Sequence, residues 1–552
     1  MMRSLVLTGT RLGVVSLLAL TAGSSSALAK AKVPVVPKWD RFEQSFKSGV
    51  YYTNPVQEAA LKVVFTSPLG ETNEVDGFWD GGRTWRVRFA PDQPGRWRFK
   101  TSCSDELNDG LHHQAGEFLC SAALGLTRFH RHGPVRVARD HRHLEHADGT
   151  PFFWLADTVW NGARMAERKE WQFYAGIRAR QGFTVAQWAA APGEDEKEQP
   201  AWTGFPECIA INPDFFQRLD EKLEVLSQAG ILSAIVPLLE TQAQRRGVAL
   251  MLPDDQAELL VRYVVARWGA EPVAWLLAVE GDRTAKDVGR WKRIGQAVFG
   301  SRPHAPVVLF TGETQWLLDE FRDENWVDVF GYQSVNDMTE DALKWTFSGP
   351  FAKEWQKEPT RPIIPFAPYE NSPTPRAGKR FSADDVRRAA YWSLLLTPPA
   401  GVSYGAYGVV DWDRSVEPQE EKVRGGDLPM WQKAMFMPGA KQMSHLAKLM
   451  NSVDFEQLRP QPKAVAKQPG SESPERTIVA ASTEPNTLSL IYVPEDRTLD
   501  VLLTALPVSP VVRWFNPRTG DSNPAVAVVG GNSCQFPTPE PGDWVLQMKA
   551  GK

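Results

Sequence analysis

The segment Pro272-Val-Ala-Trp-Leu-Leu-Ala-Val279, which runs directly into Glu280-Gly-Asp282, decides the fold. It contains no charged residue and is typical of a strand buried on both faces of a parallel sheet. Seven more largely apolar runs occur in the chain, and stretches with helical spacing separate them. The eight runs are 151–160, 183–190, 231–239, 272–279, 305–311, 326–333, 362–369 and 401–407. Eight strands that alternate with helices predict a (β/α)₈ TIM barrel over residues 127–450.

Both flanks of the barrel have β-rich sequences. In residues 38–122, the run Thr84-Trp-Arg-Val-Arg-Phe89 alternates strictly between polar and apolar residues, as a half-buried strand does. Residues 455–550 contain four more short β-rich runs, so each flank is expected to form a β-sandwich. The stretch 460–474 is rich in Pro, Lys and Ser and is expected to be a surface linker or long loop.

The first residues have the pattern of a secretory signal peptide. Arg3 and Arg11 precede the apolar stretch 12–22, and small residues then lead to Ala29. We expect cleavage after Ala29, which makes residues 1–29 the signal peptide and the mature protein secreted or periplasmic. No other stretch reaches the roughly 18 apolar residues of a membrane span.

The composition argues against a nucleic-acid ligand. Lys and Arg number 62 against 66 Asp and Glu, which gives a formal net charge of −4, whereas nucleic-acid-binding proteins concentrate basic residues. The 21 Trp residues suit a carbohydrate-binding protein because sugar rings have flat apolar faces, although tryptophan also fills hydrophobic cores. Neither a P-loop nor an H-E-x-x-H pattern occurs, so we expect no cofactor and no metal. The oligomeric state is left open.

Cys103 and Cys120 flank a polar, glycine-containing segment, and an exported protein can form disulfides. We therefore expect a Cys103–Cys120 disulfide that closes a hairpin and stabilises the fold by about 3 kcal/mol. Cys208 and Cys534 are isolated in the sequence and are expected to be buried free thiols.

The catalytic groups of a (β/α)₈ barrel lie at the carboxyl ends of its strands, so the residues after each apolar run are the site candidates. They are mostly carboxylates, amides and aromatics, which is the set that hydrolysis of a glycosidic bond needs. One carboxyl group protonates the leaving oxygen, a second attacks or activates water, amides bind hydroxyls, and aromatics stack on the sugar. The candidates for substrate binding are Asp157, Trp160, Gln187, Trp188, Glu240, Asp282, Gln333, Tyr404, Tyr407 and Asp411.

Glu280 and Glu370 are the predicted catalytic pair. Glu280 directly follows an apolar strand, where partial burial would keep a carboxyl group protonated near neutral pH. Glu370 follows the seventh run and would face Glu280 across the mouth of the barrel, as a retaining mechanism requires. Alternatively, Glu280 is a solvated loop residue, and Glu370 caps the polar loop 371–379.

Several motifs match the pattern of a known family. They are Pro151-Phe-Phe-Trp-Leu-Ala-Asp157-Thr-Val-Trp160, Gly182-Phe183, Trp275 to Asp282, Tyr369-Glu370, and Arg387-Arg-Ala-Ala-Tyr391-Trp392 with Gly401-Val-Ser-Tyr404-Gly405. These resemble the successive motifs of the apiosidase-like glycoside hydrolases, bacterial (β/α)₈ enzymes that act on plant pectic side chains. The resemblance covers nearly the whole mature chain. It implies hydrolysis of a polysaccharide, with an immunoglobulin-like domain before the barrel and a β-sandwich after it.

Two positions need comparison with that family's pattern. Its strand-four motif is close to W-I-L-G-G-D, which places the acid on Glu280, while a shift of two residues would select Asp282. Its strand-seven motif is close to P-V-L-N-G-E-P-x-Y-E, whose first Glu falls on Ala367, with one residue missing before Tyr369-Glu370. Because alanine cannot attack a sugar, a catalytically inactive glycan-binding protein is the alternative function.

Two other patterns point elsewhere. The run Gly401-Val-Ser403-Tyr-Gly405 matches the G-x-S-x-G motif of serine hydrolases, but the residues after it are not helical and the only later histidine is His445. A serine esterase is therefore the third candidate. Five histidines lie between His130 and His146 before the first barrel strand, and we expect them to be solvated hairpin residues on the amino side, away from the site.

Overall fold

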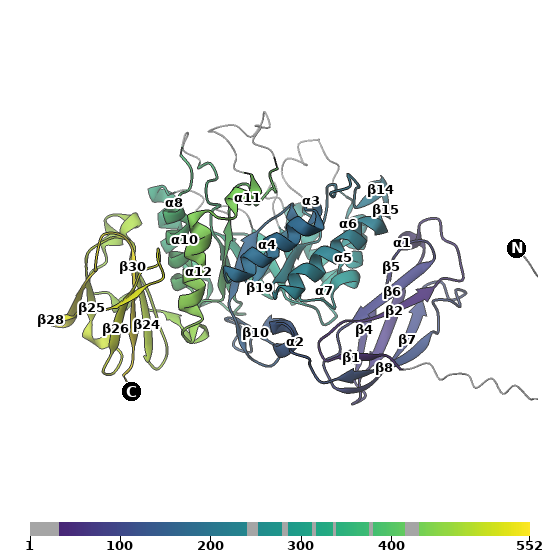
Figure 1. Cartoon of the computed structure of the whole chain (residues 1–552), viewed down its shortest axis with the longest axis horizontal. Helices are drawn as coiled ribbons and strands as arrows, with labels where there is room; N and C mark the ends of the chain where they lie inside the picture. Colours follow the sequence, from purple (N-terminus) through teal and green to yellow (C-terminus); the bar gives the residue numbers. More distant parts are fainter. Residues whose placement is uncertain are drawn as a thin grey trace, which may run out of the picture.

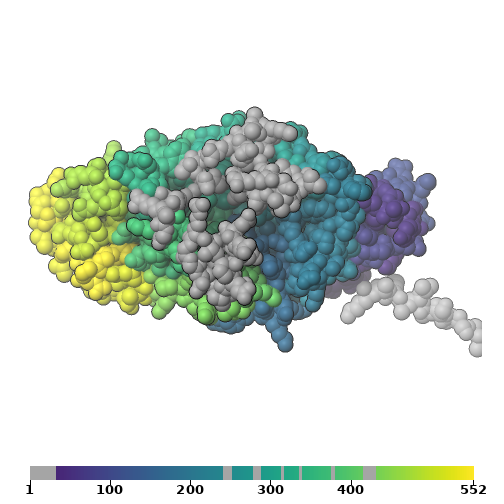
Figure 2. Space-filling view, turned by 90° about the horizontal axis from the view of Figure 1, so that it is seen from above, coloured from purple at the N-terminus to yellow at the C-terminus, as the bar shows by residue number. Residues whose placement is uncertain are grey.

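The computed structural model describes residues 33–239, 252–278, 285–311, 316–334, 338–374, 379–414 and 430–551. Three domains follow one another along the chain: a β-sandwich, a central barrel and a second β-sandwich (Figure 1). The two sandwiches lie at opposite ends of the barrel, both in this view and in the view from above (Figure 2). Within the described ranges, no helix is both long and apolar enough to cross a membrane.

The N-terminal sandwich packs a five-stranded sheet against a three-stranded one. The larger sheet contains β1 (Val35–Pro37), β8 (Ala115–Ser121), β7 (Gly95–Cys103), β3 (Leu61–Thr66) and β4 (Thr72–Asp76). The smaller one contains β2 (Phe42–Lys47), β6 (Thr84–Phe89) and β5 (Phe78–Trp79). Aromatic rings fill the core, where Phe42 stacks on Phe118 with ring centroids 4.1 Å apart. The first predicted sandwich is therefore confirmed.

Cys103 and Cys120 are free, so the predicted disulfide is wrong. Both residues lie in the antiparallel pair β7–β8, but Cys120 is opposite Gly95 at the start of β7, and Cys103 ends that strand. Extended chain separates the two positions by about 26 Å, whereas a disulfide needs Cα atoms within about 7 Å. Burial raises the pKa of the Cys120 thiol to about 11. Cys534 is buried as expected, but Cys208 is exposed.

The barrel is closed, and its neighbouring strands are all parallel. In barrel order, they are β12 (Trp154–Thr158), β13 (Val185–Ala189), β16 (Leu232–Val236), β17 (Val273–Ala278), β18 (Val307–Thr311), β19 (Val329–Gln333), β20 (Ile363–Phe366) and β21 (Gly401–Gly405). Each lies within one of the eight predicted runs, which confirms the (β/α)₈ barrel. The longer surrounding helices are α4 (Arg168–Arg180), α5 (Pro213–Gln228), α6 (Asp254–Trp268), α7 (Ala285–Phe299), α8 (Glu340–Ser348), α10 (Ala383–Leu396) and α12 (Pro438–Met450).

Each barrel strand sends successive side chains to opposite sides. Ala156 and Ala234 belong to the core inside the barrel, while their neighbours Leu155 and Ile235 belong to the core between the barrel and its helices. Both cores are apolar, as expected for a parallel sheet covered on both faces. This alternation decides which side chains near the strand ends face the mouth and which face the helices.

Asp220 on α5 joins the N-terminal sandwich to the barrel. Its carboxylate accepts hydrogen bonds from the guanidinium groups of Arg88 on β6 and Arg267 on α6, and from the indole of Trp268, at distances from 2.6 to 3.1 Å. Burial alone would raise the pKa of Asp220, but the charges of Arg267 and Arg88 lower it to about 2. The carboxylate is therefore ionised at neutral pH and holds two domains together.

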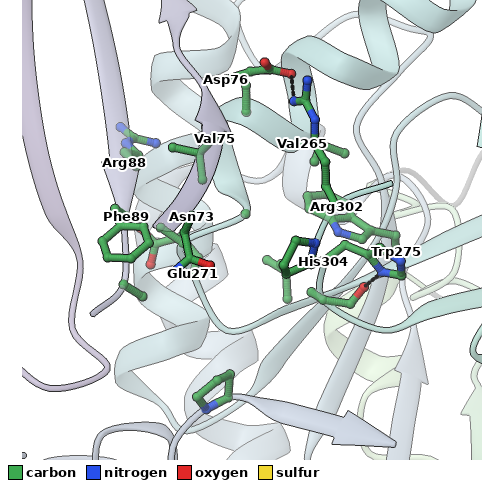
Figure 3. A pocket seen from close by; sticks show the side chains of 18 of the residues that line it. Asn73, Val75, Asp76, Arg88, Phe89, Val265, Glu271, Trp275, Arg302 and His304 are labelled. Atoms are coloured by element: carbon green, nitrogen blue, oxygen red, sulfur yellow. Dashed lines mark hydrogen bonds and ion pairs between the residues drawn. The ribbon is translucent and has the colours of Figure 1, made fainter. Parts of the chain in front are cut away.

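A cavity of about 350 Å³ lies at the same junction. Side chains of β4 and β6, such as Phe89, line it on the sandwich side, and Arg302, His304 and Trp275 line it on the barrel side (Figure 3). Arg302 donates to Asp76 across the junction at 2.6 Å. The cavity adjoins the amino ends of β17 and β18, so it lies away from the carboxyl ends at which barrel chemistry takes place.

The C-terminal sandwich also packs two antiparallel sheets. One contains β22 (Arg459–Pro460), β23 (Val479–Ser482), β24 (Leu488–Val493), β30 (Trp544–Lys549), β26 (Val511–Phe515) and β27 (Ser522–Pro524), and the other contains β25 (Thr498–Leu502), β29 (Ser533–Pro537) and β28 (Val528–Gly530). Ala464 and Val465 are buried in its core. The stretch 460–474 is therefore part of the packed domain, which corrects the expectation of a linker.

Helix α10 holds this second sandwich on the barrel. Arg387 donates two hydrogen bonds to Asp543, at 2.7 and 2.8 Å, and both side chains are buried. One turn further along, Tyr391 stacks on Tyr492 with ring centroids 4.9 Å apart. The Arg387 to Trp392 motif thus serves domain packing.

Candidate functional site

A short chain of neutral polar side chains lies inside the carboxyl end of the barrel. The Thr158 hydroxyl donates to Gln187 Oε1, and Gln187 Nε2 donates to Ser403 Oγ, each at 2.9 Å. These residues come from the three adjacent strands β12, β13 and β21 and are almost fully buried. Gln187 is predicted to bind substrate, but its side chain is inaccessible, so this prediction is wrong. Gln187 instead links Thr158 and Ser403, and these three residues form a polar floor under the barrel mouth.

Trp160 and Tyr369 form an aromatic edge above this floor. The indole Nε1 of Trp160 donates to the Tyr369 hydroxyl at 3.1 Å, and both side chains are half-buried. Trp160 packs on the core inside the barrel, as a residue facing the mouth does. The Tyr369 ring covers Gly405, where a Cβ atom would overlap it.

Asp157 points in the opposite direction to its neighbour Thr158. Its Oδ2 accepts hydrogen bonds from Arg178 Nε at 2.7 Å and from the Tyr174 hydroxyl at 2.9 Å, both on the covering helix α4. Because Asp157 is fully buried in an ion pair behind the barrel wall, the prediction that it binds substrate is wrong. It ties β12 to α4 instead.

Trp188 and Tyr404 also face the helices. Trp188 packs against Trp268 of α6 with ring centroids 5.6 Å apart, and Tyr404 lies near Phe183. Both side chains are fully buried in the outer core, which lies between the barrel and its helices. Neither can contact a substrate there, so the predictions that they bind substrate are wrong.

Glu370 is likewise turned away from the mouth. Its Oε2 accepts a hydrogen bond from the Tyr404 hydroxyl at 2.6 Å and another from the backbone N–H of Gly439, at the start of α12, at 3.0 Å. Burial raises the pKa of Glu370, and the bonds from Tyr404 and Gly439 oppose this rise. A carboxylate held behind the barrel wall cannot attack a sugar in the mouth, so the structure contradicts the predicted nucleophile.

Ala367 occupies the place of the first Glu in the family's strand-seven motif, and it cannot act as a nucleophile. It is buried in the outer core, and its backbone N–H donates to the carbonyl oxygen of Ser403 at 3.0 Å.

The other predicted site residues fall into two groups. Gln333, Tyr407 and Asp411 are half-buried at or beyond the carboxyl ends of β19 and β21. The backbone N–H of Tyr407 donates to the carbonyl oxygen of Glu370 at 2.9 Å, which places Tyr407 beside the end of β20. The residues that lie outside the described ranges are Glu240, Glu280 and Asp282. Their roles, and those of Gln333, Tyr407 and Asp411, stay predictions.

Ser403 does not occupy a nucleophile elbow. It lies in the middle of β21, and a turn rather than a helix follows that strand. His445 lies on α12, outside the barrel wall, where its ring adjoins Gly520 of the second sandwich. The serine hydrolase geometry is therefore absent from these two residues.

The histidine cluster before the barrel also differs from the expectation of solvated side chains. His146 is buried, and its Nδ1 bonds to the carbonyl oxygen of Gly133 at 2.8 Å, while His141 is exposed. Across the described part of the chain, no group of three or more His, Cys, Asp or Glu residues could hold a metal ion.

Comparison with known sequences gives three family matches. Residues 138–457 match "Apiosidase-like, catalytic domain", residues 35–104 match a domain of unknown function (DUF5060), and residues 460–549 match "Putative collagen-binding domain of a collagenase". A search of curated proteins finds no match.

Two solved structures described as glycoside hydrolases have the same fold. A "putative glycoside hydrolase" from Bacteroides vulgatus superimposes with a TM-score of 0.68 at 18% identity, covering 94% of this chain and 99% of the other. A family 5 glycoside hydrolase from the same organism gives 0.66 at 21% identity, covering 77% and 95%. The catalytic-domain match spans more than half of the sequence, so the chain belongs to the apiosidase-like family and has a fold found in glycoside hydrolases.

Proposed function

We propose that this protein is a secreted glycoside hydrolase that cleaves a polysaccharide, with plant pectic side chains as the substrate class. The observation that carries the proposal is the match of the whole barrel to the apiosidase-like catalytic domain. An aromatic edge at the barrel mouth, made by Trp160 and Tyr369, supports a sugar ligand because aromatic rings pack well on apolar sugar faces. The sequence of residues 1–29 supports export.

Glu280 is the proposed proton donor. It stands two residues after the end of β17, and catalytic groups of this fold follow the strand ends. The group protonates the glycosidic oxygen as the bond to the anomeric carbon breaks, and the leaving alcohol departs neutral.

The second carboxylate must come from a residue other than Glu370 or Asp157, since both are held behind the barrel wall. Glu240 follows β16, next to β17, and Asp411 follows β21, on the opposite side of the barrel. The distance from the Glu280 carboxyl group then decides the stereochemistry. About 5 to 5.5 Å permits attack on the anomeric carbon and retention, whereas about 6.5 to 9.5 Å leaves room for a water and gives inversion.

A glycan-binding protein without hydrolytic activity is the second candidate. The outward orientation of Glu370 favours it, because the position nearest to the family's strand-seven carboxylate provides no nucleophile at the mouth.

A screen of the purified full-length mature protein against plant and bacterial polysaccharides separates these candidates. We expect new reducing ends from a pectic polysaccharide and a single anomer in the first product spectrum by proton NMR. Binding to a polysaccharide without release of reducing ends would support the second candidate. N-terminal sequencing of the exported protein should begin at Lys30 if the signal peptide is cleaved as proposed.

A further inference from the structure

Tyr369 and Glu370 are consecutive residues that face opposite sides of the barrel wall. The Tyr369 ring covers the inner side of Gly405 at the end of β21. Glu370 reaches the outer side, where Tyr404, the residue before Gly405, donates to its carboxylate. Side chains of consecutive residues in extended chain alternate in this way. The direction of one side chain therefore depends on the anchoring of the other.

Glu370 is fixed by its backbone as well as by its side chain. Its N–H donates to the carbonyl oxygen of Gly405 at 2.9 Å, and its own carbonyl oxygen accepts from the N–H of Tyr407 at 2.9 Å. Its Oε2 accepts the bonds from Tyr404 and from the N–H of Gly439. A Cβ atom at position 439 would overlap Oε2, so a larger residue there would displace the carboxylate from this place. These contacts hold the peptide that carries Tyr369.

The ring of Tyr369 is half-buried at the mouth and is tied to Trp160 by the 3.1 Å hydrogen bond. The hydroxyl of Tyr369 thereby orients the indole, whose ring carries more apolar surface than any other side chain type. The two residues follow the carboxyl ends of β12 and β20, the strands that flank β21 on either side. They form one connected aromatic edge next to the polar floor of Thr158, Gln187 and Ser403.

We propose that Trp160 and Tyr369 form a stacking subsite for the apolar face of a sugar ring, and that Glu370 is a positioning residue that holds this subsite in place. This inference rests on the proposed function and assigns a recognition element to the same mouth. The role of Glu370 is to accept hydrogen bonds, and no bond to the substrate is made or broken by it.

The conservative variant Glu370→Gln separates positioning from chemistry. Both hydrogen bonds end on the same atom, Oε2, so an amide oxygen in that place accepts both. A nucleophile would be lost on the same change, because an amide does not attack an anomeric carbon. Glu370→Ala removes the acceptor and is expected to release Tyr369. Tyr404→Phe removes one donor only and is the milder variant if Glu370→Ala does not fold.

The binding test is electrophoresis of full-length protein through gels that contain citrus pectin, or any other polysaccharide found in the screen. Tyr369→Ala and Glu370→Ala should each weaken binding about tenfold, the loss expected for one stacked ring. In hydrolysis assays, KM should rise by a similar factor, while kcat falls less than about threefold, and Glu370→Gln should restore both. Tyr51→Ala is the control, because Tyr51 is 81% exposed on the first sandwich.

Crystal structures of the variants test the positioning without substrate. The contact between Trp160 Nε1 and the Tyr369 hydroxyl should persist in Glu370→Gln and be lost in Glu370→Ala. An unchanged Tyr369 in Glu370→Ala would refute the anchor, and a thousandfold fall in kcat for Glu370→Gln with unchanged KM would place Glu370 in the chemistry instead. If the wild type binds no polysaccharide, the proposed function and the stacking subsite both fail, and the crystal structures still decide the role of Glu370.

Discussion

Replacement of Asp220 by asparagine tests the junction between the first sandwich and the barrel. The carboxylate of Asp220 accepts five hydrogen bonds, four of them from the guanidinium groups of Arg88 and Arg267 and one from Trp268. An asparagine would turn an NH₂ group toward donors on one side and would remove the negative charge between two buried cations.

The expected loss of stability is about 3 kcal/mol at pH 7. Removing one partner of a buried ion pair destabilises a protein by about 3 to 5 kcal/mol. The lower value applies here because Arg267 keeps its ion pair with Asp80, and Arg88 keeps its ion pair with Glu43. The pKa gives a similar magnitude: a fall from 3.8 to about 2 corresponds to about 2 kcal/mol. Because the folded-state pKa of Asp220 is the lower one, this stabilisation is present above pH 4 and is lost as the pH falls toward 2.

Urea unfolding followed by tryptophan fluorescence at pH 7, 5 and 3 measures both effects. The difference between wild type and Asp220→Asn should be largest at pH 7 and 5 and smaller at pH 3. The neighbouring Glu221→Gln is the matched control, since the Glu221–Arg168 pair is exposed and contributes less than about 1 kcal/mol. A difference below about 1 kcal/mol at pH 7, or one that is independent of pH, would refute this account of the junction.

Three shorter predictions concern the other domains and the barrel wall. Arg387→Ala leaves the Asp543 carboxylate without its buried partner and should destabilise the second sandwich by about 3 kcal/mol. Limited proteolysis would detect this as cleavage near residues 455–460. Resistance to the protease equal to that of the wild type would contradict the role of Arg387 in docking the sandwich. Thiol titration of denatured, unreduced protein should find all four cysteines, and a count of two would show that a disulfide forms after all. Ser403→Ala removes one hydrogen bond from Gln187, so the rate of hydrolysis should stay within about threefold of wild type. Complete loss of hydrolysis would support the serine esterase hypothesis instead.

The architecture could be predicted from the sequence because each domain repeats one simple pattern. Apolar runs such as 272–279 are long enough for barrel strands, and the alternation in 84–89 has the period of a half-buried strand. Helix α5 begins at a local signal of the same kind, because Asn212 caps it and Pro213 occupies its first turn. Such local signals do not depend on contacts between distant parts of the chain.

The direction of side chains in the barrel wall could not be predicted in the same way. Both faces of a barrel strand are apolar, so the sequence 154–158 gives no period from which to learn that Asp157 faces the helices and Thr158 the mouth. A shift of one residue exchanges the two faces, which is why Glu370 was placed on the wrong side. Thr158 was missed because a small hydroxyl next to a carboxylate carries no catalytic signal of its own.

The disulfide prediction failed for a related reason. Cys103 and Cys120 do belong to two paired strands, but their register follows from the nine-residue length of β7. The spacing in sequence contains no information about which ends of the two strands are opposite each other.

The most direct test of the account is the rate at which Glu280→Gln releases reducing ends from the pectic polysaccharide that the wild type cleaves. As the proton donor, Glu280 should contribute about 10² to 10⁴-fold to turnover, so the variant should lose activity by that factor. Its activity on an aryl glycoside with a good leaving group should fall much less, because such a group departs without protonation. Asp282→Asn is the matched comparison: as a predicted substrate-binding residue, it should raise KM while its turnover stays close to wild type. Unchanged turnover in Glu280→Gln, with loss in Asp282→Asn, would contradict the assignment and transfer the acid role to Asp282.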